Sequence, residues 1–334
     1  MRRSKRILVT GGAGFIGSHL VDYLVGQDHE VIVLDDLSTG SAENLTGAIS
    51  TNRANLIIGS VLDAEALKVA MQGCDMVYHL AVQCVRRSIG MPIENHHINA
   101  TGVINTLECA REAGVSKFLY CSSSEIYGNC GDEWLNEITS VPLPTTVYGA
   151  SKLVGEHYTK AYQETYGMPV TIVRPFNAYG PREHCSGDLA EVIPRFSIKL
   201  LNGDPPVIFG DGNQTRDFTF VMDIARGIAE AGMCEEATGK TINIAYGRGR
   251  SIKEIASSLA IICGREDIAP IFSEERPGDI IALQADTKMA QEILKFKPNV
   301  QFNEGLKIFL EWLNSNFPDL KIFKDDPIRN WISE

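Results

Sequence analysis

The stretch Ile7-Leu8-Val9-Thr10-Gly11-Gly12-Ala13-Gly14-Phe15-Ile16-Gly17 decides the fold of this 334-residue chain. Its apolar start predicts a short buried strand, and the glycine-rich turn that follows opens a helical pattern through Leu20 and Leu24. Glycines permit a tight turn and let the backbone approach a pyrophosphate, which the first N–H groups of the helix then bind. The spacing therefore predicts a dinucleotide site formed by Gly11, Gly14, Phe15, Ile16 and Gly17.

A carboxylate at the end of the second predicted strand favours NAD over NADP. The apolar run Val31–Leu34 ends at Asp35, 18 residues beyond Gly17. A carboxylate at this position accepts hydrogen bonds from the adenosine ribose hydroxyls and repels a 2′-phosphate. We expect Asp35 to bind NAD in this way. Asp36 either shares this role or is a solvated turn residue.

Strand-like and helical segments alternate through the first half of the chain, which is typical of a parallel sheet covered by helices on both faces. After about Arg174, prolines and glycines break the pattern into shorter elements. We therefore expect an α/β fold: a Rossmann-like, doubly wound parallel sheet in residues 1–175 and a smaller C-terminal mixed α/β substrate lobe in residues 176–334, with some segments returning to the main sheet. The expected strands are 7–10, 31–34, 56–58, 76–80, 117–121 and 170–173, and the expected helices are 63–71, 98–113 and 148–166.

Composition and charge argue against several classes of protein. The formal net charge of −11 argues against a nucleic-acid surface. No apolar run approaches the length of about 20 residues that a membrane span requires. The eight cysteines form no C-x-x-C pair and no metal-like spacing. These features favour a cytoplasmic protein with reduced cysteines and no metal site.

Tyr148 and Lys152 carry the chemistry that the sequence indicates. They lie four residues apart and so share one face of a predicted helix. An ammonium beside a phenol favours the phenolate, so we expect Lys152 to lower the pKa of Tyr148 and allow it to act as a general base or acid. A serine cluster followed by an acid, Ser122-Ser123-Ser124-Glu125, lies between the glycine turn and this pair.

Taken together and in order, these motifs resemble the extended short-chain dehydrogenase/reductases that act on nucleotide sugars, the NAD-dependent epimerase/dehydratase group. The resemblance runs from Lys5 to about Trp312. It rests on the glycine turn and on six further motifs: Asp35–Gly40, His79–Ala81, Asn99–Gly102, Ser122–Gly128, Tyr148–Lys152 and Arg174–Pro181.

The resemblance implies a role for each matching residue. Tyr148 would be the catalytic base, Lys152 would hold the nicotinamide ribose, and Ser123 would hydrogen-bond the sugar hydroxyl. Backbone groups of Leu80 and Ala81, together with Asn99, would contact the cofactor. The substrate would be held by Ser123, Ser124, Asn177, Arg216 and Arg276, with the two arginines on its diphosphate. A homodimer is implied, paired through the helices 98–113 and 148–166.

Two positions depart from the family pattern. The acidic residue that commonly contacts adenine after the third strand is missing from Gly59-Ser60-Val61-Leu62-Asp63, so the adenine contacts differ here. The pair of acids that follows Arg-Asp-Phe in the family is Met222-Asp223, so only the second acid is kept.

Glu125 is the residue that separates the reactions of the group. All of them begin when Tyr148 takes the proton of the sugar's 4-hydroxyl while NAD oxidises carbon 4. Members that are 4-epimerases typically carry a small or neutral residue at this position, whereas 4,6-dehydratases and uronic-acid decarboxylases typically carry Glu. A carboxylate can remove the acidified proton on carbon 5 of the 4-keto sugar.

We therefore expect 4,6-dehydration of a nucleotide sugar, with UDP as the nucleotide from the general resemblance. The first alternative is a UDP-sugar 4-epimerase in which Glu125 is not catalytic, and the second is a UDP-glucuronate decarboxylase. A non-enzymatic NAD-binding scaffold is disfavoured because Tyr148 and Lys152 are both present. A plain alcohol dehydrogenase is disfavoured by the diphosphate-binding motifs.

Overall fold

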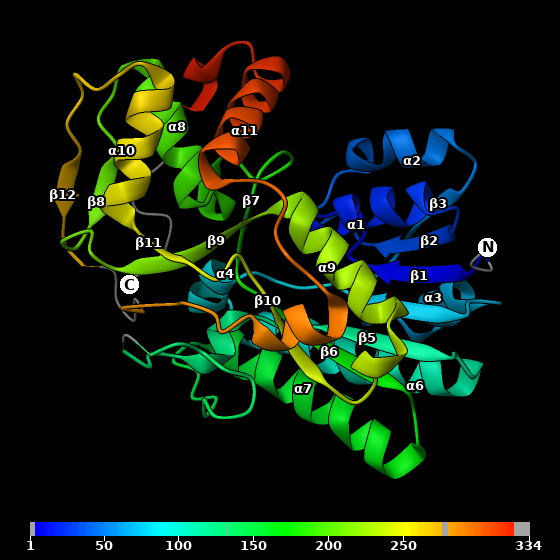
Figure 1. Ribbon diagram of the computed structural model, residues 1–334. Coiled ribbons are helices and arrows are strands. Elements are labelled where there is room, and N and C mark those ends of the chain that lie inside the picture. Colours follow the sequence, from blue (N-terminus) through cyan, green and yellow to red (C-terminus); the bar gives the residue numbers. More distant parts are fainter. Residues whose placement is uncertain (1–3, 132, 276–279, 324–334) are drawn as a thin grey trace.

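A single parallel sheet forms the centre of the molecule. The structure is a computed structural model, and it describes residues 4–131, 133–275 and 280–323. Seven strands run in the order β3-β2-β1-β4-β5-β6-β10, and every pair of neighbours is parallel. This topology confirms the expected Rossmann-like sheet (Figure 1). The strands are β1 (Arg6–Thr10), β2 (Glu30–Asp35), β3 (Ala54–Ile58), β4 (Met76–His79), β5 (Lys117–Cys121), β6 (Val170–Pro175) and β10 (Thr241–Ile244).

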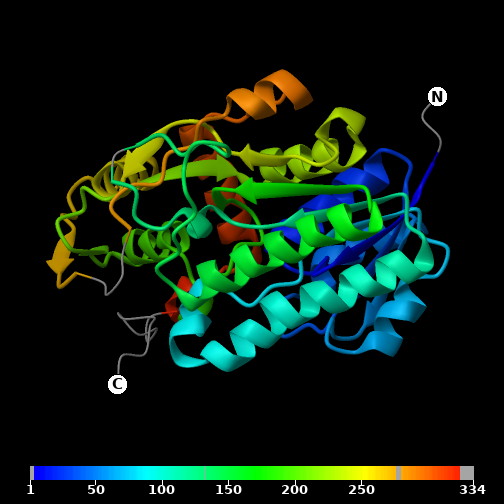
Figure 2. The ribbon, with the colours of Figure 1, turned by 90° about the horizontal axis from the view of Figure 1, so that it is seen from below.

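Helices cover both faces of this sheet because its strands are apolar on both sides. Ile7 and Val9 of β1 are packed in the core under α1 and α9, whereas Leu8 between them belongs to the core under α3, α6 and α7. Figure 2 shows α6 and α7 side by side on the second face. The first face carries α1 (Phe15–Gly26), α2 (Thr46–Ser50) and α9 (Val221–Met233), and the second carries α3 (Ala64–Met71), α6 (Gly102–Ala113) and α7 (Val147–Tyr166).

The helical region before β5 is longer and less regular than expected. It begins with α4 (Val85–Gly90) and α5 (Pro92–His96), where a proline occupies the first turn. A π-helical turn, η2 (His97–Thr101), then joins α5 to α6. Hydrophobic periodicity alone did not predict this turn, and such π segments often occur near functional sites.

The C-terminal half contributes a smaller lobe of short elements, as expected. Its own core is rich in aromatic and aliphatic side chains, among them Phe196, Phe218 and Phe309. Strand β10 leaves this half of the chain and pairs with β6 of the main sheet. The lobe contains a mixed sheet of β7 (Asn177–Tyr179), β9 (Thr215–Phe220) and β11 (Gly249–Ser251), the parallel pair β8 (Val207–Phe209) and β12 (Ile271–Ser273), and the helices α8 (Val192–Asn202), α10 (Ile252–Cys263) and α11 (Phe302–Asn316).

A buried ion pair fixes helix α7 on the sheet. The guanidinium of Arg174 at the end of β6 donates to both carboxylate oxygens of Glu156 on α7, each at 2.8 Å, and to the hydroxyl of Tyr127, also at 2.8 Å. Arg174 and Glu156 are almost fully buried. Because a buried charge without its partner is strongly destabilising, both members of this pair are required to hold α7 in place.

Two further expectations concern the state of the cysteines and the presence of membrane-spanning helices. All eight cysteines are free thiols. Within the described ranges, no helix has the length and apolar character needed to cross a membrane.

Candidate active site

A cleft with a volume of about 450 Å³ lies between the carboxyl ends of the main strands and the C-terminal lobe. Ligands of open parallel sheets bind at this position, where the strand order reverses between β1 and β4. The structure brings most of the predicted site residues into its wall. These are Gly11, Gly14, Phe15, Ile16, Gly17, Asp35, Asp36, Leu80, Ala81, Ser123, Ser124, Glu125, Tyr148, Lys152, Asn177 and Arg216.

The glycine turn is shaped by close approaches of the backbone. Gly11 has a φ of +69°, and a Cβ atom there would lie 2.7 Å from the backbone nitrogen of Ala81 in the loop after β4. A Cβ atom on Gly17 would lie 2.1 Å from the Gly11 carbonyl oxygen. Gly14 precedes α1 and has no side chain, so no side chain at this position accepts hydrogen bonds from the first N–H groups of the helix. The turn therefore fits a pyrophosphate bound at the helix N-terminus.

Asp35 lies in the wall beside this turn and is 7% exposed. Its carboxylate accepts hydrogen bonds from the backbone N–H groups of Ala13 and Leu37, both at 2.9 Å. Burial raises the pKa of Asp35, and these two hydrogen bonds oppose that shift. Asp36 is exposed and accepts a hydrogen bond from the N–H of Ser38 at 3.0 Å, as a turn residue does.

The segment that departs from the family pattern lies next to Asp35. The N–H of Gly59 donates to the Asp35 carbonyl oxygen at 3.1 Å, and Gly59, Ser60 and Val61 all line the cleft. The family commonly has an acid at this position. Here the wall presents Gly59, the hydroxyl of Ser60 and the apolar side chain of Val61 instead.

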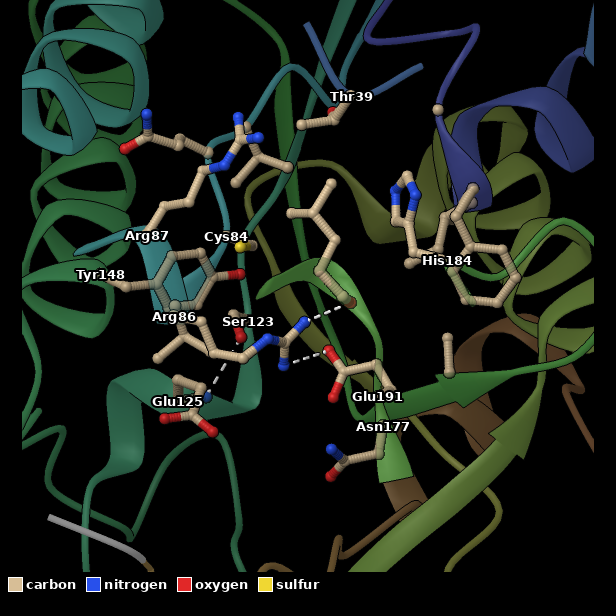
Figure 3. A pocket seen from close by; sticks show the side chains of 18 of the residues that line it. Thr39, Cys84, Arg86, Arg87, Ser123, Glu125, Tyr148, Asn177, His184 and Glu191 are labelled. Carbon is tan, nitrogen blue, oxygen red and sulfur yellow. Dashed lines mark hydrogen bonds and ion pairs between the residues drawn. The ribbon is translucent and has the colours of Figure 1, made fainter. Parts of the chain in front are cut away.

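The predicted catalytic residues gather at one end of the cleft (Figure 3). Tyr148 lies in the first turn of α7. Thr146 caps this helix, because its hydroxyl accepts a hydrogen bond from Gly149 N–H at 3.0 Å. Ser123 caps the short 3-10 turn η3 (Ser124–Tyr127) by accepting from the N–H of Glu125 at 3.2 Å. The Ser123 hydroxyl lies close enough to Tyr148 to influence the pKa of its phenol.

The electrostatics of Tyr148 and Lys152 are set mainly by burial. Burial raises the pKa of Tyr148 above its ordinary value; the Ser123 hydroxyl lowers it, and the negative charge of Glu125 raises it further. Lys152 is 2% exposed, and burial lowers its pKa to about 8. Its ammonium donates to the Cys121 carbonyl oxygen at 2.6 Å. Burial thus dominates the pKa of Tyr148 and Lys152 is directed at a backbone carbonyl, so the lowering of that pKa by Lys152 stays a prediction.

Asn99, which we expected to contact the cofactor, is fully buried and does not line the cleft. Its side-chain amide accepts from Gln83 N–H at 2.8 Å and donates to the Gln83 carbonyl oxygen at 2.9 Å. Asn95 extends this network by donating to the carbonyl oxygens of Gln83 and Cys84. The geometry thus gives Asn99 a positioning role for the loop after β4, and its direct contact with the cofactor stays a prediction.

Several residues of the wall escaped the sequence analysis. Arg86 on α4 reaches across the cleft to Glu191, with Nη1 2.9 Å from the carboxylate, and to the Leu189 carbonyl oxygen at 2.6 Å. Cys84 lies beside Tyr148 in the same region (Figure 3). The double arginine Arg86-Arg87 was the available signal, but a sequence offers no means of telling a cleft arginine from one on a solvated helix face.

The predicted diphosphate residues lie on the opposite side of the cleft. Asn177 starts β7, and its side-chain oxygen is buried without a hydrogen-bond partner, as a ligand-binding group would be. The guanidinium of Arg216 on β9 donates to the carbonyl oxygens of Thr215 and Ile280 at 2.8 and 2.7 Å. Arg276 lies outside the described residues.

Comparison with known proteins places this site in a family. The family model described as the NAD dependent epimerase/dehydratase family matches residues 7–245, which is more than half of the chain. The chain belongs to the NAD-dependent epimerase/dehydratase family. The resemblance inferred from the motifs is thereby confirmed.

Members of the family with different reactions are about equally similar to this chain. The UDP-glucose 4-epimerase of Thermotoga maritima, solved with UDP-glucose, has a TM-score of 0.88 at 34% identity and covers 93% of this chain and 99% of its own. The dTDP-glucose 4,6-dehydratase of Streptomyces venezuelae, solved with NAD, has a TM-score of 0.88 at 32% identity, covering 94% and 98%. The UDP-N-acetyl-alpha-D-glucosaminuronate decarboxylase of Bacillus cytotoxicus is 36% identical over 330 residues, covering 92% and 97%.

Membership identifies NAD as the cofactor, and the residues present fit it. The glycine turn leaves room for a pyrophosphate, and Asp35 presents a carboxylate in the cleft wall at the end of β2, where this fold type binds a ribose. The one acid that this chain keeps after Arg216-Asp217-Phe218 is structural: Asp223 pairs with Arg226 at 2.9 Å and accepts from the N–H groups of Asn299 and Val300. The glycine turn, Asp35 and Asp223 therefore do not distinguish between the different reactions of the family.

Proposed function

We propose that this protein is an NAD-dependent UDP-hexose 4,6-dehydratase. The single observation that carries the proposal is the carboxylate of Glu125 in the cleft wall, close enough to Tyr148 that its negative charge raises the tyrosine's pKa. A 4-epimerase needs only one acid–base residue, because it oxidises carbon 4 and reduces the same carbon from the other face. A second titratable group beside the first is what dehydration requires.

The roles of the residues follow from their positions. Tyr148 accepts the proton of the 4-hydroxyl, and Ser123, which lies beside it, hydrogen-bonds that hydroxyl. When bound, NAD oxidises carbon 4 and later returns the reducing equivalent to the sugar. Lys152, held by the Cys121 carbonyl, orients the nicotinamide ribose. Glu125, with Ser124 beside it, then removes the proton on carbon 5 and passes a proton to the 6-hydroxyl, which departs as water. Hydride is returned at carbon 6, and Glu125 returns a solvent-derived proton to carbon 5, which completes the 4-keto-6-deoxy product.

The nucleotide diphosphate lies toward the C-terminal lobe in this proposal. Asn177 and Arg216 face that part of the cleft, and an arginine fork suits a diphosphate. Arg276 is proposed to join them. UDP is favoured because the relatives named above include a UDP-glucose 4-epimerase and a UDP-sugar decarboxylase, each at more than 30% identity.

The second candidate function is a UDP-sugar 4-epimerase. It is favoured by the similarity to the Thermotoga maritima 4-epimerase and by a second epimerase from Mycolicibacterium smegmatis, which is 36% identical over 313 residues. In this reading, Tyr148, Ser123 and Lys152 keep their roles and Glu125 is an acidic wall residue outside the reaction.

A homodimer paired through α6 and α7 is part of the proposal. These helices lie side by side on one face of the sheet, and α7 presents partly or fully exposed side chains such as Tyr158 and Tyr166 there. Sedimentation of the purified protein measures this assembly directly.

A panel of nucleotide sugars in heavy water tests the reaction. The protein is incubated with UDP-glucose, UDP-N-acetylglucosamine and dTDP-glucose, and the products are followed by NMR. Dehydration predicts a 4-keto-6-deoxy product with deuterium at carbon 5. A 4-epimer that forms without deuterium at carbon 5 refutes dehydration and supports the second candidate.

A pair of variants tests Glu125 itself. Glu125→Gln should lower the dehydration rate by about 10²-fold or more, the range expected for loss of an acid–base group. The matched control is Glu65→Gln, which removes an exposed carboxylate on α3 that pairs with Lys68. Full activity of Glu125→Gln would exclude the proposed role.

A further inference from the structure

The order of the strands places the parts of the cofactor along the carboxyl ends of the sheet. The glycine turn that fits a pyrophosphate follows β1, and Asp35, which fits the adenosine ribose, ends the neighbouring strand β2 (Figure 1). The next strand outward is β3, which pairs with β2 and is the outermost described strand on this side. Because the ribose of a dinucleotide lies between the pyrophosphate and the base, the base reaches the segment that follows β3, residues 59–63.

This segment is a turn that is held in place at several points. The Ser60 carbonyl oxygen accepts from the N–H of Asp63 at 3.0 Å, and the Ser60 hydroxyl accepts from the N–H of Leu62 at 3.2 Å. The Val61 carbonyl oxygen accepts from the side-chain amide of Asn105 on α6 at 3.3 Å. These contacts fix the position of Ser60 in the wall of the cleft.

Ser60 is the polar member of the turn that faces the cleft. Three residues of the turn line the cleft, and the other two are Gly59 and Val61, which have no polar side-chain group. A hydroxyl has one proton to donate and two lone pairs with which to accept. The bond from Leu62 uses one lone pair, and among the described residues the hydroxyl donates to none. Its proton and its second lone pair are therefore available to a base.

The carboxylates near this turn are directed at backbone groups. Asp35 and Asp63 each accept from two backbone N–H groups, and Asp36 accepts from one. Asp63 caps α3 and lies outside the described wall of the cleft. Asp35 and Asp36 lie at the end of β2, beside the position of the ribose. The far edge of a bound base therefore meets the Ser60 hydroxyl and not a carboxylate.

A hydroxyl and a carboxylate differ in what they bind at position 6 of a purine. A carboxylate only accepts hydrogen bonds, so it binds the 6-amino group of adenine and repels the 6-oxo group of hypoxanthine. A hydroxyl accepts from the amino group or donates to the oxo group. We propose that Ser60 is a specificity-determining residue of the cofactor site. Its hydroxyl contacts position 6 of the purine, so the protein binds NAD and nicotinamide hypoxanthine dinucleotide with similar affinity.

Competition between the two dinucleotides tests the proposal. The full-length protein is dialysed to equilibrium against an excess of both at equal concentration and then denatured, and mass spectrometry counts the released nucleotides. The bound ratio gives the ratio of the two Kd values directly. We expect it to lie within about fivefold of one, the size of a single neutral hydrogen bond. A larger preference for either dinucleotide would overturn the inference.

Ser60→Asp tests the assignment to this side chain. An aspartate can also accept from the N–H of Leu62, so the turn is kept, and its added charge acts on both dinucleotides alike. The bound ratio should shift toward NAD by at least about tenfold, because the carboxylate accepts from the amino group and repels the oxo group. An unchanged ratio would contradict the contact at position 6.

Ser41→Asp is the matched control. The Ser41 hydroxyl accepts from the N–H of Glu43 at 3.2 Å, which is the same local contact as in Ser60, but Ser41 lies outside the described wall of the cleft. This variant should keep the bound ratio of the unaltered protein. An equal shift in both variants would show that added charge sets the ratio, and would overturn the proposal. The bound ratio is measured without a sugar substrate, so it is independent of whether the protein is a dehydratase or an epimerase.

Discussion

The Lys152 ammonium donates a hydrogen bond to the Cys121 carbonyl oxygen at 2.6 Å, and this contact ties α7 to the end of β5. The ammonium also lies 4.8 Å from the centre of the Tyr120 ring, whose face attracts a cation. These contacts partly offset the burial of Lys152, but burial still lowers its pKa to about 8. Lys152 is thus a fixed cation whose proton is held less firmly than in an ordinary lysine.

The stability of the protein should depend on pH through Lys152. The folded-state pKa of about 8 lies below the pKa of 10.5 of an ordinary lysine, so the folded state loses this proton first as the pH rises. Between these two values the unfolded state binds more protons, and the free energy of unfolding from this group rises with pH. Urea unfolding of the unaltered protein and of Lys152→Met should show a difference that grows in favour of the unaltered protein between pH 8 and 10. A constant difference would show that the folded-state pKa is not lowered.

Tyr148→Phe should remove most of the activity and leave the fold intact. The phenol is the acid–base group of the first step, and such groups contribute about 10²- to 10⁴-fold to the rate. The ring remains to line the cleft, so NAD retained after purification should not change. Tyr166→Phe, on the exposed end of the same helix, is the control and should keep its turnover. Comparable turnover of the two variants would remove Tyr148 from the chemistry.

The sequence predicted the main sheet well because its signals are local. Each strand is an apolar run, and the glycine turn specifies a conformation that only glycine adopts without strain, as Gly11 does at a φ of +69°. The π turn around Asn99 was not predictable in this way, since it depends on how α5 and α6 meet the loop after β4.

Residues of the site were predicted from the sequence only where they belong to a motif with fixed spacing. Tyr148, Lys152 and Ser123 were found because their spacing is fixed, whereas the Arg86–Glu191 contact joins residues 105 positions apart and has no local pattern. The pKa of Tyr148 could not be predicted either. Spacing placed Lys152 on the same helix face, but the burial that dominates the pKa is a property of the folded cleft.

Substitution by alanine should have different effects on NAD affinity at two glycines of the same segment, Gly17 and Gly26. Gly17→Ala places a methyl group 2.1 Å from the Gly11 carbonyl oxygen, so the turn must open and NAD affinity should fall by more than tenfold, about 1.4 kcal/mol. Gly26, the last residue of α1, has no neighbouring atom within 4 Å of the added methyl group. Gly26→Ala should therefore keep NAD affinity and raise stability slightly, by up to about 1 kcal/mol. Calorimetric titration with NAD and thermal unfolding measure both effects, and equal NAD affinity in the two variants would contradict the prediction.

Asn95 joins the loop after β4 to the helix that carries Tyr148. Its buried amide donates to the carbonyl oxygens of Gln83 and Cys84 at 3.0 and 3.3 Å, and accepts from Ser151 and Asn99 at 3.2 and 3.1 Å. Asn95→Leu removes these hydrogen bonds, and a typical intramolecular hydrogen bond contributes about 0.5–1.5 kcal/mol to stability.

We therefore expect Asn95→Leu to lower both the stability and the NAD affinity, because Gln83 and Cys84 line the cleft. Asn95→Asp keeps the acceptor for Ser151 and Asn99 and loses only the donor to the loop carbonyls. It should lose NAD affinity while α7 stays in place. Urea unfolding and NAD titration of the two variants distinguish these effects, and unchanged NAD affinity in both would show that the loop is held without Asn95.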